Sequence, residues 1–262
     1  MSFQNISVSV DGALATVTIE RPAQLNALNH QTVSELECAL DGLAAEDGVR
    51  CLLLTGGGEK AFVAGADIGE LRDAAGDAEA AHDLASYGQE VFAKLESIGR
   101  PSVAMINGFA LGGGLELALA CTLRTASSTA RLGLPEVSLG IIPGYGGTQR
   151  LSRIAGPAVA REWVLTGDMF SAEEAHRVGV VNRVFEPDQL LEGTLKMVKS
   201  ISSRGPIAVQ LGMDAIARGQ DMSLCEGQAM EADMFGKAST TEDMREGMTA
   251  FLEKRPPEFT GR

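Results

Sequence analysis

A run of glycines near the middle of the chain leads directly into a stretch of strong helix formers. Residues 112–114 are all glycine, and Leu115, Glu116 and the apolar residues that follow favour a helix. The first N–H groups of a helix have no partner within it, and glycine leaves them open to another molecule. This junction can therefore hold an anion or a developing negative charge. In the alternative interpretation, Glu116 only complements the helix dipole and the glycines only allow close packing.

A second carboxylate, Glu136, follows Pro135 and precedes another glycine-rich segment at residues 140–147. That segment leads into a further helix, but it lacks the Gly-Lys-Ser/Thr ending of a Walker loop. It also lacks the glycine fingerprint of a dinucleotide-binding turn. Nucleotide hydrolysis and hydride transfer are therefore disfavoured.

The segments that must position these residues begin with strands. Residues 6–10 and 15–19 alternate apolar and polar side chains around an Asp-Gly pair, which predicts a β-hairpin. Continuous apolar runs at 51–54 and 101–106 predict strands that are buried on both faces. Strand, glycine loop and helix recur in this order, which indicates an α/β core of successive similar turns without a strict sequence repeat.

Helical spacing of apolar side chains predicts a helix after Asn29, its expected N-cap, and another through residues 84–95. From Gly156 onward the chain favours helices almost throughout. They are expected at 158–165, at 172–178, after Pro187, after Pro206 and in two further segments reaching Arg255. A helical C-terminal third is therefore expected to pack on the α/β core or on a neighbouring subunit.

Size and charge limit the class of protein. The 262 residues suit one domain, or one domain with an appendage. The formal net charge of -13 opposes nonspecific attraction to nucleic acid or to an anionic membrane. No apolar run approaches the length of a membrane span, and the first residues lack the basic and apolar regions of a signal peptide. We therefore expect a cytoplasmic protein.

The cysteines and histidines are scattered along the chain. The four cysteines occupy apolar or helical settings, which favours buried free thiols over disulfides or a metal cluster. They are Cys38, Cys51, Cys121 and Cys225. The three histidines are equally dispersed, so no spacing of ligands indicates a zinc site, and no Ser-elbow motif indicates a Ser/His/Asp triad. We expect no bound metal.

Three motifs occur in order along the chain. Ala-Gly-Ala-Asp-Ile stands at 64–68, Asn-Gly-Phe-Ala-Leu-Gly-Gly-Gly-Leu-Glu-Leu at 107–117, and a segment at 135–151 runs from Pro-Glu to Gly-Tyr-Gly-Gly-Thr-Gln-Arg-Leu. Together they resemble the enoyl-CoA hydratase (crotonase) superfamily, and the resemblance covers essentially the whole chain. It implies an α/β spiral of repeated β-β-α turns at 1–195 and a C-terminal helical trimerisation region at 196–262. The expected assembly is a trimer or a dimer of trimers.

The resemblance also implies roles for four residues. The backbone amides of Ala66 and Gly113 match an oxyanion hole that holds the thioester oxygen as it becomes an enolate. Glu116 and Glu136 match the two glutamates of true hydratases, with Glu116 activating the water and Glu136 protonating the α-carbon. One carboxylate of such a pair can act as base while its neighbour, with a raised pKa, acts as acid. Retention of both glutamates favours hydration of trans-2-enoyl-CoA to 3-hydroxyacyl-CoA in fatty-acid or related acyl-CoA degradation.

CoA enters as part of the substrate, so no separate cofactor is expected. The resemblance implies contacts with CoA for a larger set of residues. The expected contacts are Ala23, Gln24, Leu25, Ala64, Asp67, Ile68, Gly112, Gly144, Phe251 and Lys254, the last two often reaching an adjacent subunit's site. Relatives commonly carry lysines where this chain has Ala23 and Gly69, so the cations that meet the CoA phosphates are undetermined. Lys254 can equally be a solvated charge at a helix end.

Two alternatives stay open. The first is an enoyl-CoA isomerase or another acyl-CoA lyase, because the same oxyanion hole serves any thioester enolate. The second is a non-catalytic relative that binds RNA through a basic helix, which the acidic charge and the lack of such a helix disfavour. Preferences for acyl-chain length depend on helices and loops such as residues 81–91.

Overall fold

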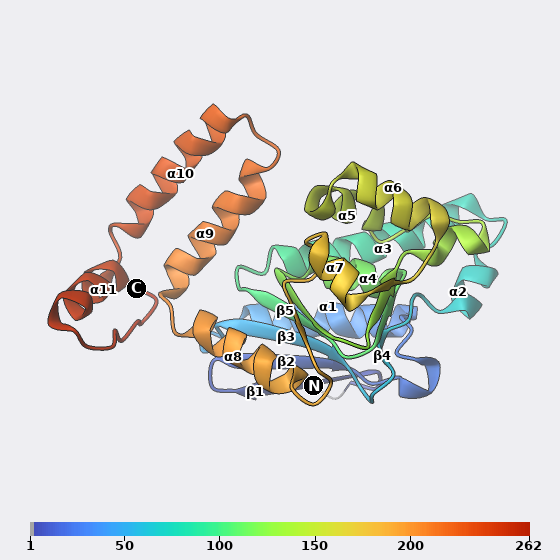
Figure 1. Cartoon of the computed structure of the whole chain (residues 1–262), viewed down its shortest axis with the longest axis horizontal. Coiled ribbons are helices and arrows are strands. Elements are labelled where there is room, and N and C mark those ends of the chain that lie inside the picture. Colours follow the sequence, from blue (N-terminus) through green and yellow to red (C-terminus); the bar gives the residue numbers. More distant parts are fainter. Residues whose placement is uncertain (1–2) are drawn as a thin grey trace.

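The computed structural model describes residues 3–262, and two parallel-rich β-sheets form its centre (Figure 1). The six-stranded sheet has the order β1-β2-β3-β5-β7-β10, and the four-stranded sheet has the order β4-β6-β8-β9. The strands are β1 Ile6–Asp11, β2 Leu14–Ile19, β3 Cys51–Gly56, β4 Ala61–Val63, β5 Ser102–Ile106, β6 Phe109–Leu111, β7 Leu123–Ser127, β8 Arg131–Gly133, β9 Phe170–Ser171 and β10 Arg183–Phe185. The predicted hairpin is confirmed, since β1 pairs antiparallel with β2.

The chain builds these two sheets together, one turn after another. β3 is followed by β4, β5 by β6 and β7 by β8, and each of these pairs leads into helical structure. Within each pair, the first strand enters the larger sheet and the second enters the smaller sheet. This arrangement confirms the expected spiral of β-β-α turns and brings the ends of successive turns to one region.

Helices cover both sheets. They are α1 His30–Ala44, α2 Ile68–Asp73, α3 Ala78–Glu96, α4 Gly113–Ala120, α5 Gly147–Ala155, α6 Pro157–Thr166, α7 Ala172–Arg177, α8 Leu190–Ser202, α9 Pro206–Gly219, α10 Leu224–Ala238 and α11 Glu242–Glu253, with short 3-10 turns η1 Pro22–Gln24 and η2 Pro135–Leu139. The Asn29 side chain caps α1 by accepting a hydrogen bond from the Thr32 N–H at 2.9 Å, as predicted.

Strand β3 is apolar throughout because both of its faces are covered. Leu52 and Leu54 pack into the main core, which includes residues of α1 and α3. Cys51 and Leu53 point the other way and pack against Met197 and Val198 of α8. α8 therefore belongs with the sheet, and the division predicted after residue 195, which stays a prediction, falls inside this helix.

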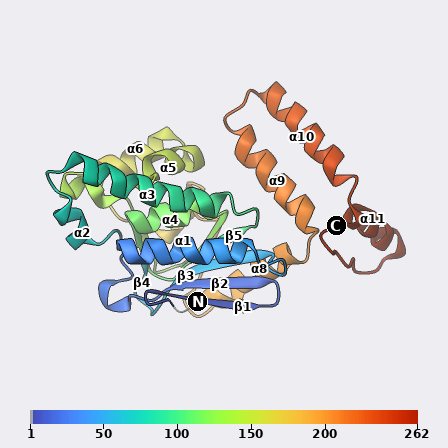
Figure 2. The same cartoon turned by 180° about the vertical axis from the view of Figure 1, so that it is seen from behind.

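The last three helices form an arm that projects from the α/β body (Figures 1 and 2). α9 and α10 pack against each other, and the end of the chain folds back onto α11. The Asp243 carboxylate accepts hydrogen bonds from the backbone N–H groups of Thr260 at 2.7 Å and Gly261 at 3.0 Å. Large apolar side chains are exposed along the arm, namely Ile216, Leu224, Phe235, Met248, Phe251 and Leu252. Exposed apolar side chains gathered in this way are typical of interaction surfaces.

The cysteines correct one prediction. Cys51 and Cys121 are buried, but Cys38 and Cys225 are exposed, and all four thiols are free. Cys38 lies on the outer side of α1, off the stripe that carries the buried Val33, Leu36 and Leu40. Among residues 3–262, no group of three or more His, Cys, Asp or Glu side chains is arranged to hold a metal ion. Nor is any helix of this part of the chain both long and apolar enough to cross a membrane.

Candidate active site

The N-terminus of α4 is fixed by close contacts that only glycine allows. Gly112 has a positive φ of 51°, and its N–H donates to the Gly133 carbonyl of β8 at 3.0 Å. A side chain on Gly114 would overlap the Val63 carbonyl group, so α4 packs directly on β4. Gly113, between them, is the first residue of the helix, and its N–H has no acceptor within the described part of the chain.

Ala66 is held beside Gly113 by the loop that precedes α1. The Leu28 N–H donates to the Gly65 carbonyl, and the Asp67 N–H donates to the Leu28 carbonyl, both at 2.8 Å. Between these two bonds, the Ala66 N–H is directed away from Leu28. It too has no acceptor in residues 3–262. A Cβ placed on Gly113 would lie 3.5 Å from the Ala66 nitrogen. Two unpaired amides are thus adjacent, and such a pair can stabilise a developing negative charge on one oxygen.

Asp67 is engaged in holding the same segment. Its carboxylate caps α2 by accepting from the Gly69 N–H at 3.0 Å, and it forms an ion pair with Arg21 at 3.1 Å. The Arg21 guanidinium keeps the pKa of Asp67 below its usual range. This side chain therefore positions the backbone around Ala66, and its expected contact with CoA stays a prediction.

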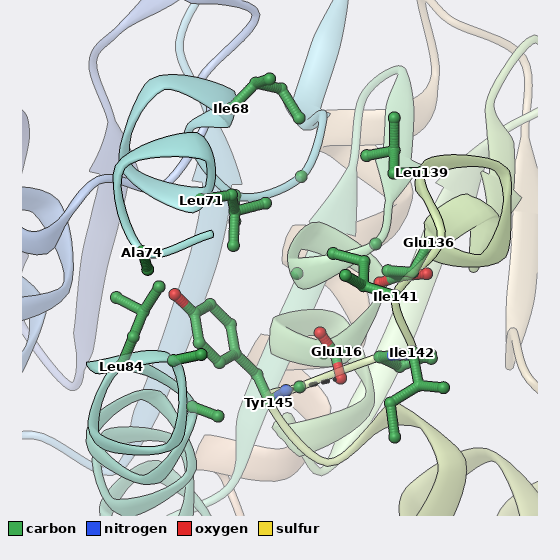
Figure 3. Close-up of a pocket in the computed structure, with 18 of the residues that line it drawn as sticks. Ile68, Leu71, Ala74, Leu84, Glu116, Glu136, Leu139, Ile141, Ile142 and Tyr145 are labelled. Carbon is green, nitrogen blue, oxygen red and sulfur yellow. Dashed lines mark hydrogen bonds between the residues drawn. The ribbon is translucent and has the colours of Figure 1, made fainter. Parts of the chain in front are cut away.

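Glu116 lies in the first turn of α4, where only 2% of the residue is exposed. Its Oε1 accepts a hydrogen bond from the backbone N–H group of Tyr145 at 2.8 Å (Figure 3) and another from that of Gly147 at 2.7 Å. Gly147 must be glycine, because a Cβ there would lie 2.9 Å from Glu116 Cγ. The glycine-rich loop before α5 therefore packs against the Glu116 carboxylate and supplies two hydrogen-bond donors to one of its oxygens.

Glu136, in the first turn of η2, reaches the same cavity from the opposite side (Figure 3). A Cβ on Gly112 would lie 2.9 Å from Glu136 Oε1, so this carboxyl group is next to the N-terminus of α4. Oε2 is buried and has no hydrogen-bond partner in the described chain. Burial raises the pKa of Glu136 to about 7. Burial, together with the charge of Glu136, also raises the pKa of Glu116 above its usual range.

A cavity of about 1020 Å³ connects these groups. Its polar groups are few, and its walls are formed mainly by small and branched apolar side chains of α2, α3 and η2 (Figure 3). Eight of the predicted site residues line it, namely Ala64, Ala66, Ile68, Gly112, Gly113, Glu116, Glu136 and Gly144. Such a cavity suits an apolar chain that carries one reactive polar group.

The remaining predicted residues lie elsewhere. Leu25 lines a separate hollow of about 280 Å³, and Ala23 and Gln24 precede it in η1. Phe251 and Lys254 lie at the end of α11 in the projecting arm, away from the cavity of the same chain (Figure 1). Their contacts with CoA remain predictions.

Sequence reasoning missed several wall residues. Tyr145 supplies an amide to Glu116, and its ring lies against Gly88 of α3 and Gly113 of α4. Leu71 of α2 and Ala74, the residue after that helix, also line the cavity. Within residues 81–91, the cavity is lined by Ala81, Leu84, Ala85 and Gln89, and the effect of this segment on acyl-chain length stays a prediction. The position of Tyr145 inside a glycine-rich loop before a helix was the one available signal for its role.

The buried state of Glu136 predicts a dependence of stability on pH. Between the ordinary glutamate pKa of about 4.3 and about 7, the folded state binds more protons than the unfolded state. The contribution of Glu136 to the free energy of unfolding therefore falls as pH rises through this window and levels off above it. Glu136→Gln removes this loss of stability at high pH. The melting temperature of the variant minus that of the parent should therefore be a few degrees larger at pH 8 than at pH 5.

Melting curves of the parent and Glu136→Gln at both pH values check this expectation. Glu90→Gln, which changes an exposed glutamate of α3, is the matched control. A Glu136→Gln effect of equal size at the two pH values would contradict the inferred burial of this carboxyl group.

Comparison with known proteins agrees with this geometry. Residues 9–262 match the model of the enoyl-CoA hydratase/isomerase family, and the chain belongs to that family. It is 43% identical to a crotonyl-CoA hydratase of Syntrophomonas wolfei over 99% of each chain. It is also 43% identical to a short-chain-enoyl-CoA hydratase of Clostridium acetobutylicum over 97% of each. The crystal structure of an enoyl-CoA hydratase from Bacillus anthracis superposes with a TM-score of 0.94 at 41% identity, covering 99% of this chain and 100% of that one.

Proposed function

We propose that this protein hydrates trans-2-enoyl-CoA thioesters reversibly to 3-hydroxyacyl-CoA, in fatty-acid or related acyl-CoA degradation. The observation that carries the proposal is the pair of buried carboxyl groups, Glu116 and Glu136, on one cavity beside two unpaired amides. The activities for which the two hydratase relatives are named support it.

In the proposed mechanism, the amides of Ala66 and Gly113 bind the thioester oxygen. Their fixed dipoles stabilise the negative charge that this oxygen gains when water attacks the β-carbon. Glu116 holds the water and takes one proton from it as the new C–O bond forms. Glu136 donates its own proton to the α-carbon, which collapses the enolate and restores the thioester carbonyl. The proton on Glu116 then passes to Glu136, directly or through solvent, which restores both groups before the next turnover.

The surroundings of the two glutamates support this division of roles. Two buried carboxyl groups so close together cannot both be ionised without a large cost. Glu116 accepts two backbone N–H bonds, which favour its ionised form, whereas Glu136 Oε2 has no donor. Burial, together with the charge of Glu136, raises the pKa of Glu116 to about 8, more than burial raises that of Glu136. On the hydrogen bonds, we assign the negative charge to Glu116 and the proton to Glu136. Both hydrogen bonds to Glu116 fall on Oε1, which leaves Oε2 for the water.

A panel of trans-2-enoyl-CoA thioesters of increasing length and branching tests the proposal. Purified protein should abolish the absorbance of the conjugated thioester and form the 3-hydroxyacyl-CoA. Migration of the double bond in a 3-enoyl-CoA, without net hydration of any 2-enoyl-CoA, would instead identify the isomerase alternative. Retention of RNA in a salt-dependent manner would revive the binding alternative.

We infer that catalysis needs no metal and no cofactor besides the CoA of the substrate, and that the protein acts in the cytoplasm.

We also propose a homo-oligomer, a trimer or a dimer of trimers, in which the arm contacts neighbouring subunits. The exposed side chains of Phe251 and Leu252, at 81% and 80%, support an apolar contact there. Phe251 and Lys254 would then lie near a subunit boundary and within reach of a neighbour's CoA.

Phe251→Glu should weaken assembly, because a charge would be buried in an apolar contact. Light scattering should give a smaller particle at a given concentration, and CoA-ester binding should weaken in parallel. Val10→Glu, which places the same charge on the exposed face of β1, is the control. Truncation before Asp243 should have the same two effects in a stronger form. A parent protein that is a stable monomer at assay concentration would contradict this assignment.

A further inference from the structure

Arg150 of α5 is a mostly buried cation close to the active site that the mechanism above does not use. Only 14% of its side chain is exposed. Its Nε and Nη2 donate to both oxygens of Glu96, at 2.8 and 2.6 Å, in a bidentate pair with the last residue of α3. The remaining nitrogen, Nη1, donates to the Tyr145 carbonyl at 2.7 Å. One guanidinium therefore ties the glycine-rich loop to α3.

The loop that Arg150 holds is the one that holds Glu116. The N–H groups of Tyr145 and Gly147 are both donors to Glu116 Oε1, and the carbonyl of Tyr145 is the acceptor for Arg150. Gly146, between them, has a φ of 100°, and a side chain there would overlap Arg150 Nη1. The glycine therefore gives the guanidinium access to the loop. Loss of Arg150 would free the loop to move both donors away from the carboxylate.

Charge also connects Arg150 with Glu116. Burial and the charge of Glu136 in η2 raise the pKa of Glu116. The two loop amides and the charge of Arg150 in α5 lower it. Arg150 is itself paired with Glu96 of α3, and the negative charge of Glu96 offsets part of the positive charge of Arg150. The cation thus opposes the effect of burial and favours the ionised form that a base needs.

We propose that Arg150, fixed by Glu96, is a positioning residue that orients Glu116 through the Tyr145–Gly147 loop and keeps it ionised for its part in the reaction. The role in turnover rests on the proposed hydration. The effect on ionisation does not, and it can be measured without substrate.

The ionisation test uses the infrared band of the protonated carboxyl group in the Glu136→Gln background, where Glu116 titrates without its coupled neighbour. The spectrum of the Glu116→Gln/Glu136→Gln protein serves as the blank. Adding Arg150→Met should raise the midpoint of Glu116 by about one pH unit. Adding Arg150→Lys, which keeps the charge but not the clamp on the loop, should raise it less than Arg150→Met does. Adding Arg153→Met, on the exposed side of the same helix, should not change it.

The kinetic test uses the same substitutions in the parent. Arg150→Met and Arg150→Lys should both lower kcat by about tenfold or more with little change in KM, because neither keeps the three-way clamp. Glu96→Gln should lower kcat less and should not raise the Glu116 midpoint, since the cation remains. The Arg150 and Glu96 variants should match Arg153→Met in circular dichroism and particle size. A variant that does not match has lost its fold, and its kinetics are then not interpreted.

The outcomes separate the two proposals. A Glu116 midpoint that Arg150→Met leaves unchanged overturns the role of Arg150 in ionisation, whatever reaction the protein catalyses. A kcat within twofold of the parent in both Arg150 variants overturns its role in positioning. If the parent hydrates no enoyl-CoA while the midpoint still rises in Arg150→Met, the proposed function fails and the electrostatic role stands.

Discussion

Glu116→Gln and Glu136→Gln should each lower hydration of a short trans-2-enoyl-CoA by about 100-fold to 10,000-fold, the usual contribution of one general acid-base group. Glutamine keeps the size of the side chain and one hydrogen-bond acceptor, but it cannot exchange a proton. In Glu116→Gln the amides of Tyr145 and Gly147 can still bind a side-chain oxygen, so the loop should keep its place. Binding of a CoA ester should therefore survive in both variants.

Steady-state kinetics and a separate measurement of CoA-ester binding check this result. Glu90→Gln should match the parent in both. The double variant should lose less than the product of the single losses, because both carboxyl groups act on one water and one transition state. Near-normal hydration in Glu136→Gln, with only Glu116 essential, would point to chemistry that needs a single glutamate and would favour the isomerase alternative.

Gly113→Val should lower turnover by about 100-fold to 1,000-fold, the usual cost of losing one oxyanion-hole donor. Even the first carbon of a side chain would stand 3.5 Å from the Ala66 nitrogen and 3.3 Å from Cδ2 of Tyr145. The branched side chain would therefore fill the space between the two amides where the thioester oxygen must approach. The loss should appear in kcat more than in KM, because the charge on this oxygen develops only in the transition state.

Gly42→Val is the matched control for this substitution. Gly42 lies in α1, and a Cβ there meets nothing within 4 Å, so this variant places the same side chain in a helix without touching the cavity. Circular dichroism and melting curves of the two variants separate lost chemistry from lost structure. A folded Gly113→Val protein as active as the parent would mean that the amide of Gly113 does not stabilise the oxyanion.

Local patterns predicted most of the elements. The alternation around Asp11-Gly12, the apolar run of β3 and the cap at Asn29 each depend on near neighbours in the sequence. The cavity-lining site residues were predicted only when three motifs were taken together. Glu116 alone allowed a structural interpretation, and its proximity to Glu136 and Ala66 depends on how successive turns of the spiral stack.

Contacts between distant residues were beyond sequence reasoning. Asp67 meets Arg21 across 46 positions, and Arg150 meets Glu96 across 54. The donors to Glu116 are backbone N–H groups, which no residue type at those positions reveals. Cys38 was expected to be buried because it stands in a helical segment, but the face on which a single residue lies depends on how that helix packs in the fold.

The most direct test of the proposed hydration follows the atoms of water into the product. Crotonyl-CoA incubated with the parent protein in H₂¹⁸O should give 3-hydroxybutyryl-CoA with ¹⁸O in its hydroxyl group, and the same reaction in D₂O should place one deuterium on the α-carbon. Mass spectrometry and proton NMR read these two labels. Both labels should vanish in parallel in Glu116→Gln and Glu136→Gln. Failure of the parent to place ¹⁸O in any product, even if it exchanges or shifts protons of the acyl chain, would contradict the assignment of this site to hydration.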